Sequence, residues 1–242
     1  MRNREKTYFI DYKGRRSYLD MSERDGVEEF FIDLTQYNIK SISDISEGLE
    51  RLRKLDSIIL TLNNIKEIEG LEKLGHIKKL VLEGNEIKEI KGLENLTELR
   101  ELNLSWNKIE EIKGLEGLTK LEILNLENNR ISMIKGLDNL TNLKFLRLSY
   151  NHISEIEGLN NLMNLEILYL LNNEISEIKG LNELSNLKVL ELGCNRIKEI
   201  KGLAQLVNLE RVSLVHNKIN NIRGMEKIIK NFDLDGNPIN QF

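Results

Sequence analysis

The side chains that most often carry out chemistry in proteins are sparse in this chain, which has three histidines and one cysteine. His76, His152 and His216 share no neighbouring carboxylate or cysteine in the sequence. Cys194 and His216 occupy equivalent places in successive repeats, but two ligands fall short of the four that a structural zinc site needs. The chain contains no phosphate-binding glycine loop, nucleophile elbow or H-E-x-x-H motif. We therefore predict a protein that is not an enzyme, with no catalytic residue, no metal ligand and no cofactor.

Charge and composition narrow the possible partners and the compartment. The formal net charge of −4 argues against a general nucleic-acid binder, which would normally present a basic face. No run of about 20 apolar residues exists, so we expect no membrane span. A single cysteine excludes an intrachain disulfide, and the basic N-terminal segment lacks the apolar region of a signal peptide. We therefore predict a cytoplasmic protein.

The elements that position every side chain of this protein follow a repeat of fixed length. Such a period of about 20 to 50 residues predicts a stack of similar units, each too small to bury its apolar face alone. Two residue types mark the 22-residue step: asparagine at 63, 85, 107, 129, 151, 173, 195 and 217, and glycine at 48, 70, 92, 114, 136, 158, 180, 202 and 224.

Within one repeat, the apolar spacing predicts a short strand followed by a return arm. Leu102 and Leu104 are two positions apart and therefore share one face of a strand. From Ile109 to Leu121 apolar residues recur every third position, which indicates extended and 3-10-like turns. We expect the asparagine to be buried and bonded to backbone groups of its own turn and the next. We expect the glycine to adopt a positive φ or to allow a close backbone approach.

The two ends of the chain depart from this pattern. Residues 1–30 predict an N-terminal cap with a β-hairpin that turns near Lys13 and Gly14, and their basic residues leave open a docking arm as the alternative. The array occupies 31–242, with an atypical first turn at 31–57, regular turns at 58–224 and a shortened last turn at 225–242.

The pattern L-x-x-L-x-L-x-x-N-x-I-x-x-I-x-G-L resembles a leucine-rich repeat over residues 32–239. Its 22-residue form is similar to the subclass of the protein phosphatase 1 regulatory subunit and of a dynein-associated light chain, and bacterial internalins also use this length. The resemblance implies an α/β fold: a right-handed solenoid with a parallel sheet of about ten short strands on the concave face. It places 3-10 or short helical turns on the convex side, and it implies that the concave face binds partners.

The outward strand positions, which vary between repeats, are the candidate partner-binding residues. Ile123, Phe145, Ile167 and Val189 fall on four consecutive strands and would form an apolar strip about 15 Å long. The alternative is that β-branched and aromatic residues simply suit a sheet surface. Because tryptophan, tyrosine and arginine are common interface anchors, the predicted site also includes residues on and beside the strip: Trp106, Glu127, Arg147, Tyr150, Tyr169, Leu171 and Glu191.

These observations favour a non-enzymatic scaffold that binds a protein partner on its concave face, as an adaptor or regulatory subunit. We expect a monomer without nucleic-acid or membrane partners. An internalin-like surface adhesion protein is the first alternative, and a structural oligomer joined through the array ends is the second.

Overall fold

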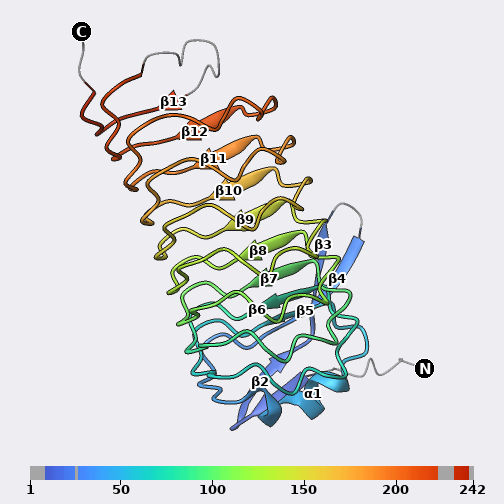
Figure 1. The fold of residues 1–242 in the computed structure, drawn as a ribbon. Helices are drawn as coiled ribbons and strands as arrows, with labels where there is room; N and C mark the ends of the chain where they lie inside the picture. The colour runs from blue at the N-terminus through green and yellow to red at the C-terminus, as the bar shows by residue number, and fades with distance from the viewer. Residues whose placement is uncertain (1–8, 25–26, 223–231, 240–242) are drawn as a thin grey trace.

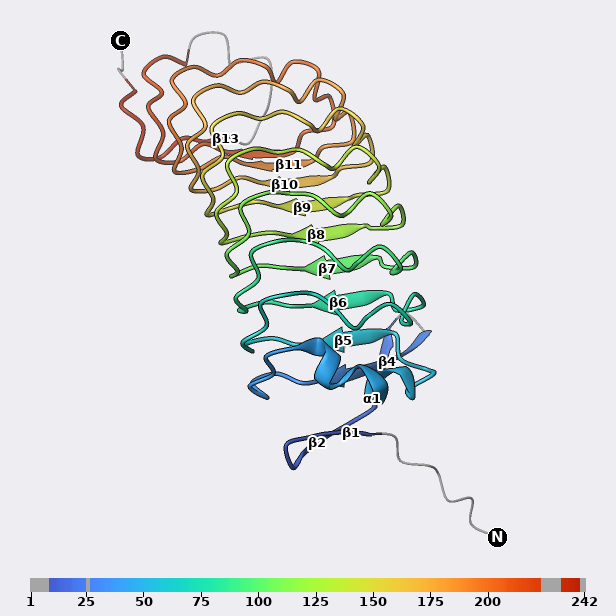
Figure 2. The ribbon, with the colours of Figure 1, turned by 60° about the horizontal axis from the view of Figure 1, so that its bottom comes forward.

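The computed structural model describes residues 9–24, 27–222 and 232–239 (Figure 1). Its turns stack into a solenoid in which each turn contributes one short strand to a common sheet, and Figure 2 shows the strands side by side along the stack. The strands that run parallel to one another are β4 (Val27–Asp33), β5 (Ser57–Ile59), β6 (Lys79–Val81), β7 (Glu101–Asn103), β8 (Ile123–Asn125), β9 (Phe145–Arg147), β10 (Ile167–Tyr169), β11 (Val189–Glu191), β12 (Arg211–Ser213) and β13 (Phe232–Asp233).

Strand pairing follows the repeat of the sequence. Leu102 pairs with Leu124 and Ile167 with Val189, so each strand pairs with the equivalent positions of the next repeat. Ile32 pairs with Ile58 across the longer first turn, and Val212 pairs with Phe232 across the shortened last turn. The strands of the irregular first and last turns therefore still pair in register with the rest of the sheet.

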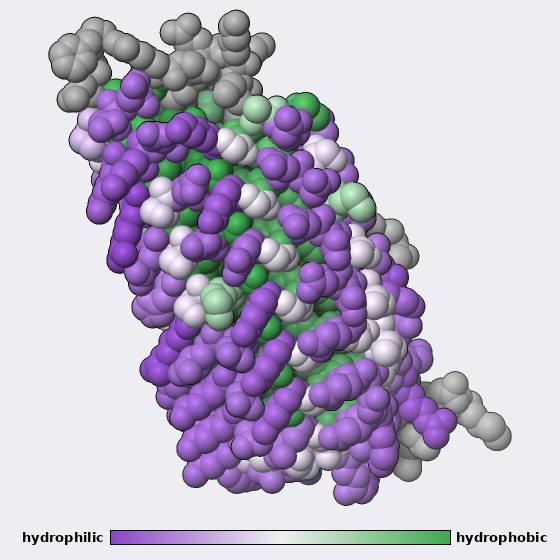
Figure 3. Space-filling view, in the orientation of Figure 1, coloured by the Kyte–Doolittle hydropathy of each residue, from purple (hydrophilic) through white to green (hydrophobic). Residues whose placement is uncertain are grey.

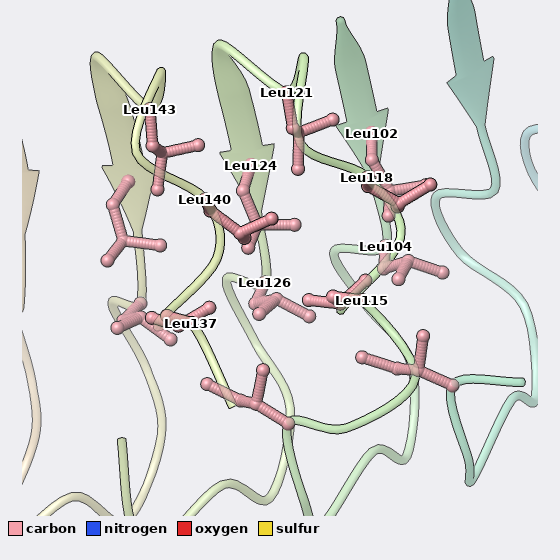
Figure 4. Close-up of a cluster of buried hydrophobic side chains, with 14 of the residues drawn as sticks. Leu102, Leu104, Leu115, Leu118, Leu121, Leu124, Leu126, Leu137, Leu140 and Leu143 are labelled. Carbon is pink, nitrogen blue, oxygen red and sulfur yellow. The ribbon is translucent and has the colours of Figure 1, made fainter. Parts of the chain in front are cut away.

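The core is a continuous stack of leucine and isoleucine side chains between the sheet and the return arm. Leu102 of β7 and Leu104, just past its end, point inward and are fully buried, as are Leu115, Leu118 and Leu121 of the return arm. Figure 4 shows these side chains meeting those of the neighbouring turns. The backbone N–H of Leu118 donates to Leu115 O at 2.9 Å and that of Leu121 to Leu118 O at 3.0 Å. The predicted three-residue turns of the convex side are thus confirmed.

The repeated asparagine binds the backbone where the chain leaves each strand. Asn129 Nδ2 donates to Leu126 O of its own turn at 3.1 Å and to Leu104 O at 3.0 Å. Its Oδ1 accepts from the backbone N–H of Ile109 at 2.9 Å. The predicted ladder is confirmed with one correction: the second turn that each asparagine binds is the preceding turn and not the next one. Within the described ranges, no buried side-chain nitrogen or oxygen lacks a hydrogen-bond partner.

The repeated glycine is required for two reasons at once. Gly136 has a φ of 70°, and a Cβ at this position would lie 2.6 Å from Ile112 O of the preceding turn. The prediction holds from Gly70 to Gly202 but not for Gly48, which lies in the short helix α1 (Ser46–Glu50). Gly224 lies outside the described residues.

The N-terminal end carries two antiparallel hairpins. The first pairs β1 (Phe9–Tyr12) with β2 (Arg15–Tyr18), and it buries Ile10 and Tyr12 against the end of the stack, next to α1 and the 3-10 helix η1 (Ile42–Asp44). The second pairs β3 (Asp20–Arg24) with β4 and extends the sheet to eleven strands, a feature that the sequence analysis does not predict. The boundary predicted at residue 30 therefore falls within a strand of the sheet.

None of the helices in the described part of the chain is long and apolar enough to cross a membrane.

Candidate functional site

The outward side chains of the central strands form the strip that the sequence predicts. Phe145 pairs with Ile123 on one side and with Ile167 on the other, and Ile167 pairs with Val189. All four side chains are half-buried, because each lies against its neighbours on the sheet surface. The structure therefore brings the four residues together on four adjacent strands.

The N-terminal part of the same face is polar and bonds to itself. Lys79 Nζ lies 2.8 Å from Glu101 Oε1 across β6 and β7. Asn103 Nδ2 donates to Glu83 Oε2 at 3.0 Å, and its Oδ1 accepts from Ser105 Oγ at 2.7 Å. These groups are already partnered, so this part of the face offers less to a ligand than the strip does.

A hollow of about 520 Å³ opens on the C-terminal part of the face, from the end of β8 to β13. Six of the predicted site residues line it, whereas Ile123, Phe145 and Ile167 do not. The other lining residues were not predicted, although three of them occupy the equivalent outward positions one repeat further along. The predicted lining residues are Glu127, Arg147, Tyr169, Leu171, Val189 and Glu191, and the missed ones are Ser149, Arg211, Ser213, Val215 and Asp233.

The floor of the hollow depends on Gly193, which the sequence analysis did not select. A Cβ at this position would lie 2.8 Å from Val215 Cγ2 and 2.9 Å from Leu171 Cδ1. The glycine therefore leaves the space in which the side chains of Leu171 and Val215 approach each other. Leu171 and Val215 therefore form an apolar part of the floor, just past the ends of β10 and β12.

Charged groups surround this floor. The guanidinium of Arg147 lies over the ring of Tyr169, 5.6 Å from its centroid, a cation–π contact that restricts where the guanidinium can lie. Glu191 Oε1 accepts from the backbone N–H of Gly193 at 3.2 Å, and Asp233 Oδ1 accepts from that of Asp235 at 3.3 Å. In each case the backbone N–H two residues further along the chain orients the carboxylate.

Trp106 and Tyr150 lie in a separate row just past the strand ends. Both adopt a left-handed backbone conformation, with a φ of 56°, and their exposed fractions are 59% and 42%. Bulky residues rarely occupy this region, because their Cβ approaches the carbonyl oxygen. Neither residue lines the hollow, although their backbone N–H groups donate to Glu127 O and Leu171 O of the next turn, and both of those residues do line it.

Rows of paired charges cover the flanks of the solenoid. Lys91 Nζ lies 2.7 Å from Glu67 Oε2 of the preceding turn, and Lys179 Nζ lies 2.7 Å from Glu155 Oε2. The hydrogen bond from Lys91 lowers the pKa of the Glu67 carboxyl, and the same bond raises the pKa of the Lys91 ammonium. Figure 3 shows hydrophilic side chains in rows over much of the visible face, with most of the apolar residues gathered in a band between them.

A second hollow of about 420 Å³ lies among these paired charges, lined by Glu67, Lys91, Glu86 and Lys108 among others. Lys108 Nζ lies 3.1 Å from Glu86 Oε2. Because the three glutamates of its lining pair with lysines and it offers no apolar floor, this hollow is a weaker candidate than the first. Over the described ranges, no group of three histidine, cysteine, aspartate or glutamate side chains is placed to hold a metal ion.

Comparisons with known proteins agree with this geometry. The family model "Leucine Rich repeats (2 copies)" matches residues 97–139, 141–183 and 185–230. An internalin (inlF) from Listeria monocytogenes is 28% identical with a TM-score of 0.78, over 88% of this chain and 62% of that one. Internalin C2 from the same species is 32% identical with a TM-score of 0.70, over 76% and 80% of the two chains.

A leucine-rich repeat protein from Leptospira interrogans is 29% identical with a TM-score of 0.76, over 86% of this chain and 55% of that one. The chain thus spans less than two thirds of inlF and of the Leptospira protein. No match was found among curated proteins. The family model covers more than half of the sequence, and the stacked parallel strands have the matching architecture, so the chain belongs to the leucine-rich repeat family.

Proposed function

We propose that the protein is a non-enzymatic scaffold that binds a protein partner on the concave face, over strands β8 to β12. The observation that carries the proposal is the contrast along this face. Polar residues at β6 and β7 bond to one another, whereas Phe145, Ile167 and Val189 form a partly exposed apolar strip beside an open hollow. Leucine-rich repeat proteins generally serve as protein-interaction modules, which supports this assignment.

Binding would derive from burial of the strip and of the apolar floor. Each square ångström of apolar surface removed from water contributes roughly 25 cal/mol. Phe145 and Tyr169 would be the main anchors, since a few large side chains usually dominate an interface. Arg147 and Glu191 would fix the orientation of the partner through charge complementarity.

The finer role that we propose is that of a monomeric adaptor or regulatory subunit in the cytoplasm. The unpaired Cys194 is in keeping with a reducing compartment. The resemblance to the protein phosphatase 1 regulatory subunit type stays a prediction.

The test is affinity capture from a lysate of the source organism, quantified by mass spectrometry. We expect Phe145→Ala/Tyr169→Ala to lose a defined set of proteins that the wild type retains. The matched control is Met163→Ala/Val207→Ala, which removes two exposed apolar side chains away from the strands, with exposed fractions of 57% and 80%. Equal recovery by wild type and both double variants would show that the concave face binds none of these partners.

The likeness to two internalins favours a second candidate, an internalin-like surface adhesion protein. Surface biotinylation of intact source cells separates the two candidates. Labelling of the protein together with a surface marker supports adhesion, and labelling only after lysis supports the cytoplasmic scaffold.

A further inference from the structure

The hollow presents two guanidinium groups on opposite sides of its floor. Arg147 lies on β9 and Arg211 on β12, and both residues are exposed. Neither side chain has a carboxylate within ion-pair distance among the residues that the structure describes. In contrast, Lys144 and Lys188, which directly precede β9 and β11, pair with Glu122 and Glu166. The hydrogen-bond donors of both guanidinium groups are therefore available to a ligand.

Three carboxylates, those of Glu127, Glu191 and Asp233, also line the hollow, and in the described part of the chain none of them forms an ion pair with either arginine. Glu191 accepts from the backbone N–H of Gly193, and Asp233 accepts from that of Asp235. Glu191 stands on β11, between the strands of the two arginines, and Glu127 follows β8, on the far side of Arg147. A negatively charged ligand group at the centre of the hollow would be repelled by Glu191, so the centre favours an uncharged group.

Part of the surface between the two arginines, beside Glu191, is apolar. Val189, Leu171 and Val215 line it, and Gly193 lets the latter two side chains converge. An apolar side chain placed there would be flanked by a guanidinium on each side.

The distance between the strands of the two arginines matches the length of four residues of extended chain. β9 and β12 are three strand intervals apart, roughly 14 Å. Four residues of extended chain span about 13 Å, and residues i, i+2 and i+4 of a strand point to the same side. Arg147 is in register with Ser213 of β12, so Arg211 is offset from it by two residues along the strand. The long arginine side chains can bridge this offset.

We propose that the hollow binds an extended acidic segment of the protein partner, with the pattern acidic–any–apolar–any–acidic. This inference rests on the concave-face function proposed above. The two carboxylates pair with Arg147 and Arg211, where the planar guanidinium allows bidentate hydrogen bonds. The central apolar side chain lies on the floor over Gly193, and Glu191 disfavours an acidic residue in its place.

The direct test measures peptide binding by fluorescence polarisation. The labelled probes are GSDSLSDSG, its basic counterpart GSKSLSKSG and its alanine counterpart GSDSASDSG. We expect the wild-type protein to bind the acidic leucine peptide at least tenfold more tightly than the basic one. We expect Arg147→Ala and Arg211→Ala each to weaken this binding about fivefold, and the flank control Lys179→Ala to leave it unchanged.

Two further variants test the charges and the floor separately. Arg147→Glu/Arg211→Glu should reverse the preference, so that the basic peptide binds more tightly than the acidic one. Gly193→Leu should abolish the difference between the leucine and alanine peptides, because the new side chain occupies the floor. Position 193 has no positive φ and the nearest atoms belong to side chains, so this variant should fold, which circular dichroism checks.

Equal binding of the acidic and basic peptides by the wild type would overturn the acidic-segment inference. A peptide-display selection on the wild-type protein then separates its failure from that of the proposed function. Selected peptides that lack the acidic pattern but lose binding to Phe145→Ala/Tyr169→Ala would leave the concave-face function standing. Selected peptides that bind this double variant and Arg147→Glu/Arg211→Glu as well as the wild type would overturn both.

Discussion

Asparagines tie successive turns together in one interior row and on the surface, where Asn139 and Asn161 form a short row beside a longer one. In the interior row, Asn151 is buried and both ends of its amide bind backbone groups, including Leu126 O and the N–H of Ile131 in the preceding turn. In the longer surface row, Asn164 donates to Thr141 O of the preceding turn at 2.8 Å, in an exposed bond. Asn142, Asn186 and Asn208 make the equivalent bond.

The two rows differ in whether water can replace a hydrogen bond that a mutation removes. Water can reach the backbone carbonyl beside Asn164, but it cannot reach the groups around Asn151 without opening the core. The surface row is also confined to the C-terminal turns: at its equivalent position the earlier turns carry Glu98 and Lys120, whose charged groups lie 2.6 Å apart. The same geometric link between turns is therefore fixed in the interior and interchangeable on the surface.

The largest expected effect comes from breaking the interior row. Asn129→Leu should lower the free energy of unfolding by about 1–3 kcal/mol, because backbone groups of two turns lose their partner in a buried site. Asn164→Leu is the matched control and should cost no more than about 0.5–1 kcal/mol. Urea denaturation followed by circular dichroism measures both. Equal losses would show that burial is not what separates the two rows.

A smaller effect is expected at the glycines next to the ladder. Gly136→Ala should cost about 1–2 kcal/mol, since alanine is strained at a φ of 70° and its Cβ would meet Ile112 O. The control is Gly117→Ala in the preceding return arm, where the nearest atom is Glu94 O at 3.4 Å and φ is not positive. Thermal unfolding of the two variants compares them, and an unchanged midpoint for Gly136→Ala would contradict the close-approach explanation.

The smallest effect is expected from the charged surface links, and it depends on pH. Lys144, with a further contribution from Arg100, holds the pKa of the Glu122 carboxyl below its ordinary value. A carboxyl whose pKa is lowered by folding stabilises the protein above its unfolded pKa, about 4.3, and this stabilisation is lost as pH falls through the folded pKa. Glu122→Gln should therefore cost about 0.5 kcal/mol at pH 7 and low salt, less in high salt, and nothing at pH 2.

Asn164→Ala is the uncharged reference for that experiment. Its small loss should be the same at pH 7 and pH 2, because no titrating group takes part in the bond from Asn164 to Thr141 O. A loss for Glu122→Gln that persists unchanged at pH 2 would mean that packing, and not charge, is the source of the effect.

Much of the fold could be predicted because each structural role repeats at a constant spacing. The interior asparagines, the positive-φ glycines and the inward Leu102 and Leu104 all follow from local geometry and from the need to bury a leucine row. The hairpin β3–β4 was missed although its signal is local: Asp25-Gly26, a common hairpin-turn dipeptide, stands between the two strands in the sequence. Trp106 and Tyr150 were assigned to the predicted site from a row just past the strand ends, and the place of that row relative to the hollow depends on the backbone turn at a φ of 56°.

By itself, the sequence determined the period, the in-register parallel strands and the residues that must point inward. Alternate side chains of a strand face opposite sides of the sheet, so the leucine rows can be buried on one side only. It also determined which positions vary on the outward face. Only the tertiary structure decided that the hollow extends to β12 and β13, that Gly193 shapes its floor and that two arginines flank it. These features depend on how side chains one or more repeats apart fill the space between strands, and repeat spacing does not specify side-chain volume.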